Sequence, residues 1–251
     1  MTIYKTLSKG EAELLNGGSD LRGSVFTSKE AEAITGSPNR ASRLLLGLKK
    51  KNWIDEIEKG KYILLVLKGP ESVDSLEIAS HILTPSYVSF WSALRFYDLT
   101  DQLPRTVFVA ATRSKPALGL SRFSVRFVYL PPSRFFGYKK ISSDNKEIFI
   151  AEKEKAIVDS LYLPRWSGGV GEVSRAISEG NFNTKKLIDY AIRMNSKSLL
   201  GRLGYLFERK GVDPYKYLGP HLGDAYVRLD PRGGLHGKTD SKWRLLINNN
   251  Y

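Results

Sequence analysis

The chain has 251 residues, a formal net charge of +13 and no cysteine. This length can bury a full hydrophobic core, and the absence of cysteine excludes disulfides and thiolate chemistry. No apolar run reaches the roughly 18 residues that a membrane span needs, and the first residues lack a secretion signal, so we expect a cytoplasmic protein. The three histidines, His81, His221 and His236, lack metal-ligand spacing, so we expect no metal or cofactor.

The positive charge predicts a polyanionic partner, most often nucleic acid. Residues 1–70 hold 12 Lys and Arg against 8 Asp and Glu, and residues 131–251 hold 21 against 13. The basic excess is therefore not confined to one end of the chain. The alternative is a charge that serves solubility alone.

Two helices are predicted before residue 36. Apolar residues in 3–15 recur at helical spacing. Thr27 and Glu30 then have the spacing of a capping box, which predicts a short helix that ends near Ile34.

A third helix is predicted from Ser37, which can cap it, and Pro38, which suits its first position. Asn52 tolerates the left-handed conformation that ends a helix. The expected buried face of this third helix consists of Ala41, Leu44, Leu45 and Leu48. A basic stripe on a different face of the helix consists of Arg40, Arg43, Gly47 and Lys50.

Two strands are predicted at residues 53–57 and 61–67, joined by a turn at 58–60. The order of three helices and a hairpin predicts a winged helix-turn-helix domain over residues 1–70. The composition of residues 68–72 indicates a boundary after it.

A mixed α/β domain is predicted over residues 71–251, which a boundary near 165–170 would divide further; the fold class is therefore α+β. Helices are predicted at 76–83, from Thr84-Pro85 onward, and at 152–163, 170–178, 184–194 and 197–210. Strands are predicted at 105–111, 124–130, 134–142, 147–151, 224–229 and 243–248, with a turn at 143–145.

The third helix is the candidate DNA-reading element, because the N-terminal end of such a helix meets base edges in the major groove. The residues expected to read bases are Asn39, Arg40, Ser42 and Arg43. Those expected to hold phosphates are Lys50, Lys59 and Lys61, together with Thr27, Ser28 and Lys29 at the start of the preceding helix. The alternative is a winged helix that contacts only proteins.

Other features of the chain have plainer interpretations. The aromatic cluster of Tyr87, Phe90, Trp91 and Phe96 is expected to pack in the core. The glycine-rich stretches at 167–171 and 233–239 lack the full spacing of a phosphate-binding loop and are interpreted as loops. The basic helices within 175–210 could meet an acidic protein, further DNA phosphates or only solvent.

A Mg²⁺-dependent nuclease is an alternative function. Asp230, Asp240 and Lys242 mimic a layout in which two carboxylates hold the metal and a lysine polarises water. The spacing is loose, and the same charges could simply solvate loops.

The chain resembles the AbiEi-type antitoxins, which are transcriptional regulators of type IV toxin–antitoxin and phage-defence systems. The resemblance rests on RLLLGLKKKNWI (43–54), GKYIL (60–64), SYVSFWSALRFYDLTDQLPRTVFVA (86–110), RFFGY (134–138), IAEKEKAIVDSLYLP (150–164) and DSKWRLLIN (240–248). The chain departs from the family at Asn52 and Asp98, where glycines are expected.

The resemblance implies a protein that is not an enzyme and has two roles. Its winged helix would bind double-stranded DNA at inverted repeats of its own promoter, as a monomer or dimer, and repress the operon. Its C-terminal domain would counter a cognate nucleotidyltransferase-like toxin encoded alongside.

Overall fold

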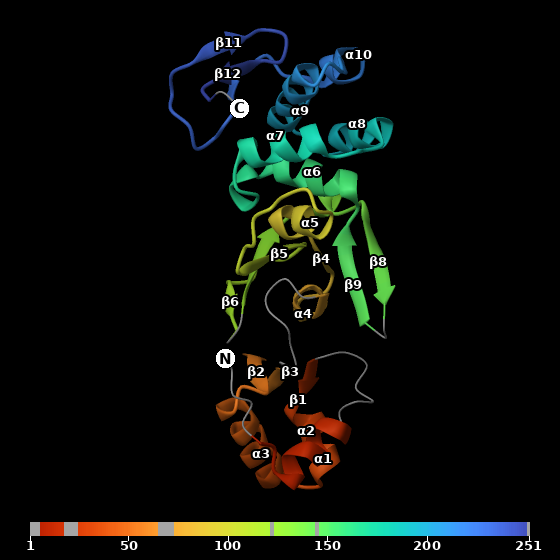
Figure 1. The fold of residues 1–251 in the computed structure, drawn as a ribbon, viewed down its shortest axis with the longest axis vertical. Helices are drawn as coiled ribbons and strands as arrows, with labels where there is room; N and C mark the ends of the chain where they lie inside the picture. The colour runs from red at the N-terminus through yellow and green to blue at the C-terminus, as the bar shows by residue number, and fades with distance from the viewer. Residues whose placement is uncertain (1–5, 18–24, 65–72, 121–122, 144–145, 250–251) are drawn as a thin grey trace.

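The computed structural model describes residues 6–17, 25–64, 73–120, 123–143 and 146–249. Within these residues the fold is α+β, as the sequence predicts, with three separate sheets. Figure 1 shows the N-terminal helices at one end of an elongated molecule, a large sheet in the middle, and further helices with a small sheet at the other end. Among the described segments, no helix combines the length and apolar character needed to cross a bilayer.

The N-terminal elements are α1 (Lys9–Gly17), β1 (Val25–Thr27), α2 (Ser28–Thr35), α3 (Pro38–Lys50), β2 (Ile54–Glu58) and β3 (Lys61–Leu64). The capping box is confirmed: the Glu30 N–H donates to Thr27 Oγ1 at 3.3 Å, and the Thr27 N–H donates to Glu30 Oε2 at 2.6 Å. Ser37 and Pro38 begin α3 as predicted. Strand β1 was not predicted, because three residues are too few to show an alternating pattern.

Helix α3 uses its leucines much as predicted. Ala41, Leu45 and Leu48 are buried, whereas Leu44 is half-buried against α1. Asn52 adopts a φ of 60°, so the chain reverses there as expected.

The N-terminal sheet is antiparallel, has the strand order β1-β3-β2 and is covered on both faces. Phe26 and Ile54 pack toward helices α1–α3. Ile57 and Ile63 belong instead to the large core of the second region, so the sheet connects the two parts of the molecule. The predicted boundary at 68–72 lies outside the described residues, and the division at residue 70 stays a prediction.

The second region begins with α4 (Val73–Ile82) and is built on a six-stranded sheet with the order β6-β7-β5-β4-β9-β8. Its strands are β4 (Ser86–Val88), β5 (Thr106–Ala111), β6 (Leu118–Gly119), β7 (Ser124–Tyr129), β8 (Tyr138–Ser143) and β9 (Lys146–Ala151). The β5–β7 and β4–β9 pairs are parallel and the other pairs are antiparallel. Of the predicted turn at 143–145, residues 144 and 145 lie outside the described part.

The helix predicted to begin at Thr84 and Pro85 is wrong. Residues 86–88 form β4 in the middle of the sheet, between β5 and β9, and helix α5 (Phe90–Phe96) begins only after Ser89. A threonine before a proline is locally compatible with a helix start or with a strand. Residues 86–88 form a strand here because their backbone groups pair with β5 and β9. The strand predicted at 134–142 likewise begins only at Tyr138.

The aromatic cluster packs in the core, as predicted. Tyr87 and Phe90 are completely buried, and Trp91 and Phe96 lie half-buried against the same core. No functional role is needed to explain these rings.

The remaining helices are α6 (Lys153–Tyr162), α7 (Val170–Glu179), α8 (Thr184–Arg193), α9 (Lys197–Arg209) and α10 (Tyr215–Leu218). Helices α6 to α9 confirm the predictions. A small sheet closes the chain with β10 (Val227–Arg228), β11 (Lys238–Asp240) and β12 (Leu245–Ile247) in the order β10-β12-β11. Strand β11 was not predicted, since its residues lie in a glycine-rich stretch.

A buried ion pair lies between the large sheet and α6. Lys155 and Asp159 are both inaccessible to solvent and pair with each other. Asp159 Oδ2 also accepts hydrogen bonds from Ser89 Oγ at 2.7 Å and Tyr87 Oη at 3.0 Å. Burial lowers the pKa of Lys155, and the attraction of Asp159 opposes that change. The network links β4 to α6 through buried polar groups, which need hydrogen-bond partners inside a core.

Trp243 fixes the C-terminal segment against α9. Its ring is fully buried over Gly204, where an added Cβ would collide with the ring, and an added Cβ at Gly201 would collide with the backbone carbonyl oxygen of Trp243. Its Nε1 donates to Glu208 Oε2 at 2.5 Å. The two glycines form a notch in α9 that accepts the tryptophan.

Candidate nucleic-acid interface

The outward face of α3 carries a set of exposed side chains. Asn39, Arg43, Leu46 and Lys50 follow one another at intervals of four, three and four residues, which places them on one stripe. Arg43 Nε donates to the carbonyl of Asn39, at 3.5 Å. Within the described residues neither Arg43 nor Lys50 has a carboxylate partner, so both cations are available to a ligand.

Leu46 is a candidate contact that the sequence analysis missed. Its side chain is 55% exposed, in the middle of this polar stripe. An apolar side chain at such a position can contact the methyl group of thymine. The signal was available in the helical phase, since Leu46 lies three residues after Arg43 and four before Lys50.

Arg40 lies on another side of α3. Its Nη2 lies 3.2 Å from Glu13 Oε2 on α1. Gly47, from the same predicted stripe, also faces α1, where Glu11 leaves little room for a Cβ. Both side chains of the Arg40–Glu13 pair are 52% exposed, so the pair is weak and a phosphate could replace the carboxylate. The base-reading role of Arg40 stays a prediction, less favoured by position than that of Arg43.

Ser42 is exposed on the opposite flank of α3, the side that approaches β2. There Lys49 Nζ donates to Glu56 Oε2 at 2.8 Å, and this hydrogen bond raises the pKa of Lys49 and lowers that of Glu56. This flank is therefore close to neutral, and the positive charge of α3 is concentrated on its outward stripe.

The hydrogen-bond donors of Thr27 and Ser28 at the start of α2 are already engaged by oxygen atoms of the protein. The N–H and hydroxyl of Thr27 both donate to Glu30 Oε2, at 2.6 and 2.8 Å. The N–H and hydroxyl of Ser28 donate to the carbonyl of Gly60, at 2.8 and 3.0 Å. Lys29 is exposed beside them. Of the three residues predicted to contact phosphate at this helix, Thr27 and Ser28 use their donors within the protein, and Lys29 is exposed to solvent.

The β2–β3 turn presents Lys59 at its exposed tip, and Gly60 supplies the left-handed conformation with a φ of 72°. Lys61 is half-buried, paired in register with Thr27 and Glu58 on the two neighbouring strands. Glu58 forms an ion pair with Lys115 of the second region, and the hydrogen bond from Lys115 lowers its pKa. Lys59 is the freer of the two predicted phosphate contacts.

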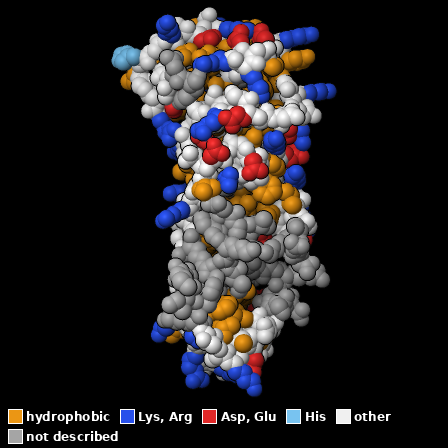
Figure 2. Space-filling view, viewed as in Figure 1, with side chains coloured by type: hydrophobic (Ala, Val, Ile, Leu, Met, Phe, Trp, Pro, Cys, Tyr) orange, Lys and Arg blue, Asp and Glu red, His pale blue; other side chains and the backbone are white. Residues whose placement is uncertain are grey.

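Figure 2 shows Lys and Arg side chains at the lower tip of the molecule, over helices α1–α3. The structure thus brings Asn39, Arg43 and Lys50 together on one surface of α3. It places Arg40 and Ser42 on its flanks.

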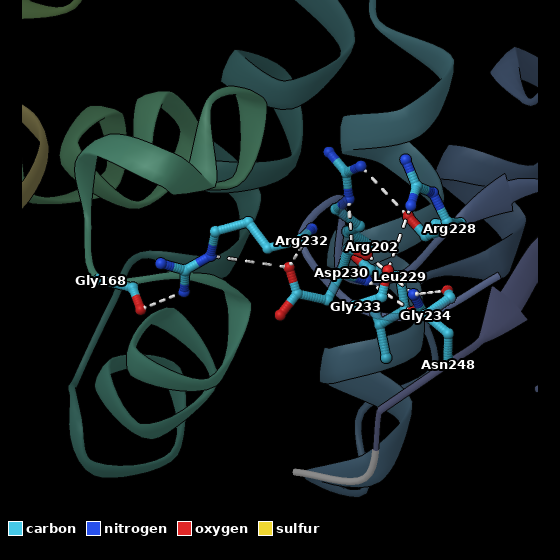
Figure 3. A network of polar contacts seen from close by, with 9 residues as sticks. All are labelled: Gly168, Arg202, Arg228, Leu229, Asp230, Arg232, Gly233, Gly234 and Asn248. Atoms are coloured by element: carbon cyan, nitrogen blue, oxygen red, sulfur yellow. Dashed lines mark hydrogen bonds and ion pairs between the residues drawn. The ribbon is translucent and has the colours of Figure 1, made fainter.

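The residues of the nuclease alternative have local structural roles. Asp230 is 5% exposed, its Oδ1 accepts the N–H of Arg232 at 2.9 Å, and its backbone exchanges hydrogen bonds with the Asn248 side chain (Figure 3). Asp240 Oδ1 accepts the N–H of Trp243 at 2.8 Å.

Lys242 is held by two other carboxylates. Its Nζ lies 2.6 Å from Glu208 Oε1 and 2.8 Å from Asp213 Oδ2. In the part of the chain that is described, no group of three or more His, Asp and Glu side chains is arranged to hold a metal ion. Asp230 and Asp240 therefore do not form such a group there.

The two glycine-rich stretches meet in space (Figure 3). Arg232 Nη2 donates to the carbonyl of Gly168 at 2.6 Å. Gly169 has a φ of 104°, and a Cβ there would collide with the Arg232 guanidinium. These glycines allow a close approach between two loops, which the sequence analysis treated as separate.

Comparisons with known proteins bear on the fold. No family model matches the sequence, and no curated protein matches it significantly. The crystal structure of the RV2827C protein from Mycobacterium tuberculosis is similar, with a TM-score of 0.65 and 13% sequence identity over 96% of this chain and 92% of that chain. At this identity the likeness concerns the fold alone, and it extends over nearly the whole of both chains.

Proposed function

We propose that this protein is a DNA-binding transcriptional repressor whose N-terminal part acts as a winged helix-turn-helix. In this proposal α3 enters the major groove, Asn39 and Arg43 read base edges, and Lys50 and Lys59 contact phosphates. Arg40, Ser42, Lys61 and the start of α2 have supporting roles.

The observation that carries the proposal is the outward stripe of α3. Arg43 and Lys50 are exposed and have no carboxylate partner within the described residues. Most other cations near this helix are already paired, as Lys49 and Lys51 are with Glu56 and Glu11. A cationic stripe left unpaired on a projecting helix suits a polyanion with a groove of helical width.

Binding to the DNA that precedes the protein's own gene tests the proposal. Fluorescence anisotropy of that duplex, titrated with the full chain at several salt concentrations, should show tight binding that weakens steeply with salt. A scrambled duplex of the same length is the control, and it should bind more weakly. The absence of salt-sensitive binding to either duplex would instead favour an adaptor that contacts only proteins.

We further propose, from the family resemblance, that the protein is the antitoxin of a nucleotidyltransferase-like toxin. Growth of cells that express an adjacent gene of that class, with and without this protein, tests the role. Rescue by the full chain and by a variant unable to bind DNA would separate the antitoxin role from repression. The engaged contacts of Asp230, Asp240 and Lys242 disfavour the nuclease alternative, for which incubation of DNA with the protein and Mg²⁺ is the direct check.

A further inference from the structure

A groove with a volume of about 400 Å³ lies between α7 and α9. Its lining consists of Gly171, Ser174, Arg175, Ser178, Leu206, Arg209 and Lys210. Three of these residues are cations, two carry hydroxyl groups, and none is acidic. Figure 1 places α7 and α9 in the opposite half of the molecule from α3, so the groove is separate from the surface proposed to bind DNA.

Lys210 is held in position by the end of α7. Its Nζ donates to the carbonyl of Ile177 at 2.7 Å and to that of Gly180 at 3.2 Å. An ammonium group has three donors, so one N–H remains for a ligand. The charge is fixed at the edge of the groove without being neutralised by these two carbonyls.

Arg175 and Arg209 supply the other two charges. Arg175 Nη2 donates to Glu172 Oε2 at 2.7 Å, and the other oxygen of Glu172 accepts a hydrogen bond from Thr100. Arg209 lies 6.0 Å from the ring centre of Tyr205 and has no carboxylate partner among the described residues. Three cations thus surround the groove with one carboxylate beside it.

The serines and Leu206 complete the lining. Ser178 Oγ donates to the carbonyl of Ser174 at 3.0 Å, which leaves its oxygen able to accept a hydrogen bond. Leu206 is buried and provides an apolar wall. Cations, hydroxyls and one apolar side chain in a concave site match a small ligand with a phosphate group and an organic part.

The geometry points to a binding site for a small phosphorylated ligand between α7 and α9, in which Arg175, Arg209 and Lys210 hold the phosphate. A volume of about 400 Å³ is within the usual range of small-molecule sites. A DNA backbone would instead favour cations spread along an open surface, as on α3.

Calorimetric titration of the full chain with pyrophosphate, at low ionic strength, tests this site. We expect saturable binding at one site per chain, weakened about tenfold by Arg209→Gln and by Arg175→Gln, because each removes a charge-assisted hydrogen bond. Lys216→Gln is the matched control: this exposed lysine lies on α10, outside the groove lining, and its loss should leave the affinity unchanged. Thermal melting of each variant verifies that it folds.

Three results would overturn the inference. One is the absence of saturable pyrophosphate binding to the unaltered chain. Another is an equal loss of affinity in Lys216→Gln, which would indicate a general effect of net charge. The third is a loss of DNA affinity in Arg175→Gln and Arg209→Gln when pyrophosphate binds neither these variants nor the unaltered chain. That result would assign the groove to a nucleic-acid backbone.

Discussion

Helices α3 and α9 are alike in sequence and differ in how the fold uses them. Each has 13 residues, and each mixes leucines with arginines and glycine: PNRASRLLLGLKK in α3 and KSLLGRLGYLFER in α9. Helix α3 buries only Ala41, Leu45 and Leu48, whereas α9 buries eight residues, including both of its glycines and Arg202. A similar pattern therefore produces an exposed surface in one place and a core element in the other.

The two arginines show what the difference means. Arg202 is 5% exposed and donates to three carbonyls, those of Leu229, Leu161 and Arg228, at 2.9, 3.1 and 3.2 Å. Arg43 is exposed, and among the described residues its side chain forms a hydrogen bond only within its own helix. The segments packed over an arginine decide whether it stabilises the fold or remains available to a ligand.

Substitution of Arg202 should have the largest effect on stability. Arg202→Ala would leave three carbonyls without their donor and open a cavity, so the free energy of unfolding should fall by roughly 3 kcal/mol. Urea denaturation measures it, and Arg43→Ala, expected within about 0.5 kcal/mol of the parent, is the matched control. Similar losses in both variants would remove the contrast between the helices.

Gly204→Ala probes the notch in α9. A Cβ at this position collides with the buried ring of Trp243, so we expect a loss of roughly 2 kcal/mol from overpacking. Gly119→Ala is the control, because no atom of the described residues lies within 4 Å of the added carbon there. If both variants unfold at the urea concentration of the parent, Trp243 does not depend on the glycine.

Arg43→Ala should act on DNA affinity while leaving stability nearly unchanged. Loss of a bidentate contact to a base should cost roughly 1–3 kcal/mol of binding free energy and relax sequence choice at one position. Anisotropy titrations with duplexes altered one base pair at a time measure this effect. Unchanged affinity and specificity would exclude Arg43 from base recognition.

Glu11→Gln tests how α1 holds the end of α3. Burial alone would raise the pKa of Glu11, but hydrogen bonds from Lys51 and Ser8 lower it below its usual 4.5. Because the folded state favours the carboxylate form of Glu11, the ionised side chain stabilises the fold. This contribution to the free energy of unfolding is complete above pH 4.5 and is lost as the pH falls through the lowered pKa.

The variant should therefore lose about 1 kcal/mol of stability at pH 7. The difference from the parent should shrink in urea denaturations carried out below pH 4.5. Glu13→Gln, at an exposed position on the same helix, should show little difference at either pH. A loss in Glu11→Gln that persists unchanged in acid would mean that the charge of Glu11 is not its cause.

Lys59→Ala should have the smallest effect. A phosphate contact at the turn contributes equally for all DNA sequences, so the affinity should fall slightly and uniformly. The slope of the logarithm of the affinity against the logarithm of the salt concentration should decrease in magnitude by about one. Titrations over a range of salt concentrations measure the slope. A change confined to one DNA sequence would indicate that Lys59 contacts a base.

Short-range signals were the most predictable part of this fold. Thr27 with Glu30, and Ser37 with Pro38, begin their helices as expected, because a cap needs only neighbours along the chain. The same kind of signal failed at Thr84 and Pro85, where β5 and β9 pair with the following residues. Of the candidate site, the stripe containing Arg43 and Lys50 followed from helical phase, but the pairing of Arg40 with Glu13 required the position of α1.

The sequence by itself determined the α+β class, the caps of α2 and α3, most helices and the phase that separates the buried leucines of α3 from Arg43 and Lys50. All of these depend on local geometry and periodicity. Only the tertiary structure decided which cations are engaged: Arg202 beneath three carbonyls, Lys155 beside Asp159, and Lys242 between Glu208 and Asp213. These partners are distant in sequence or hidden among many similar charges, and a charged side chain is free or fixed according to what the fold places within hydrogen-bond reach.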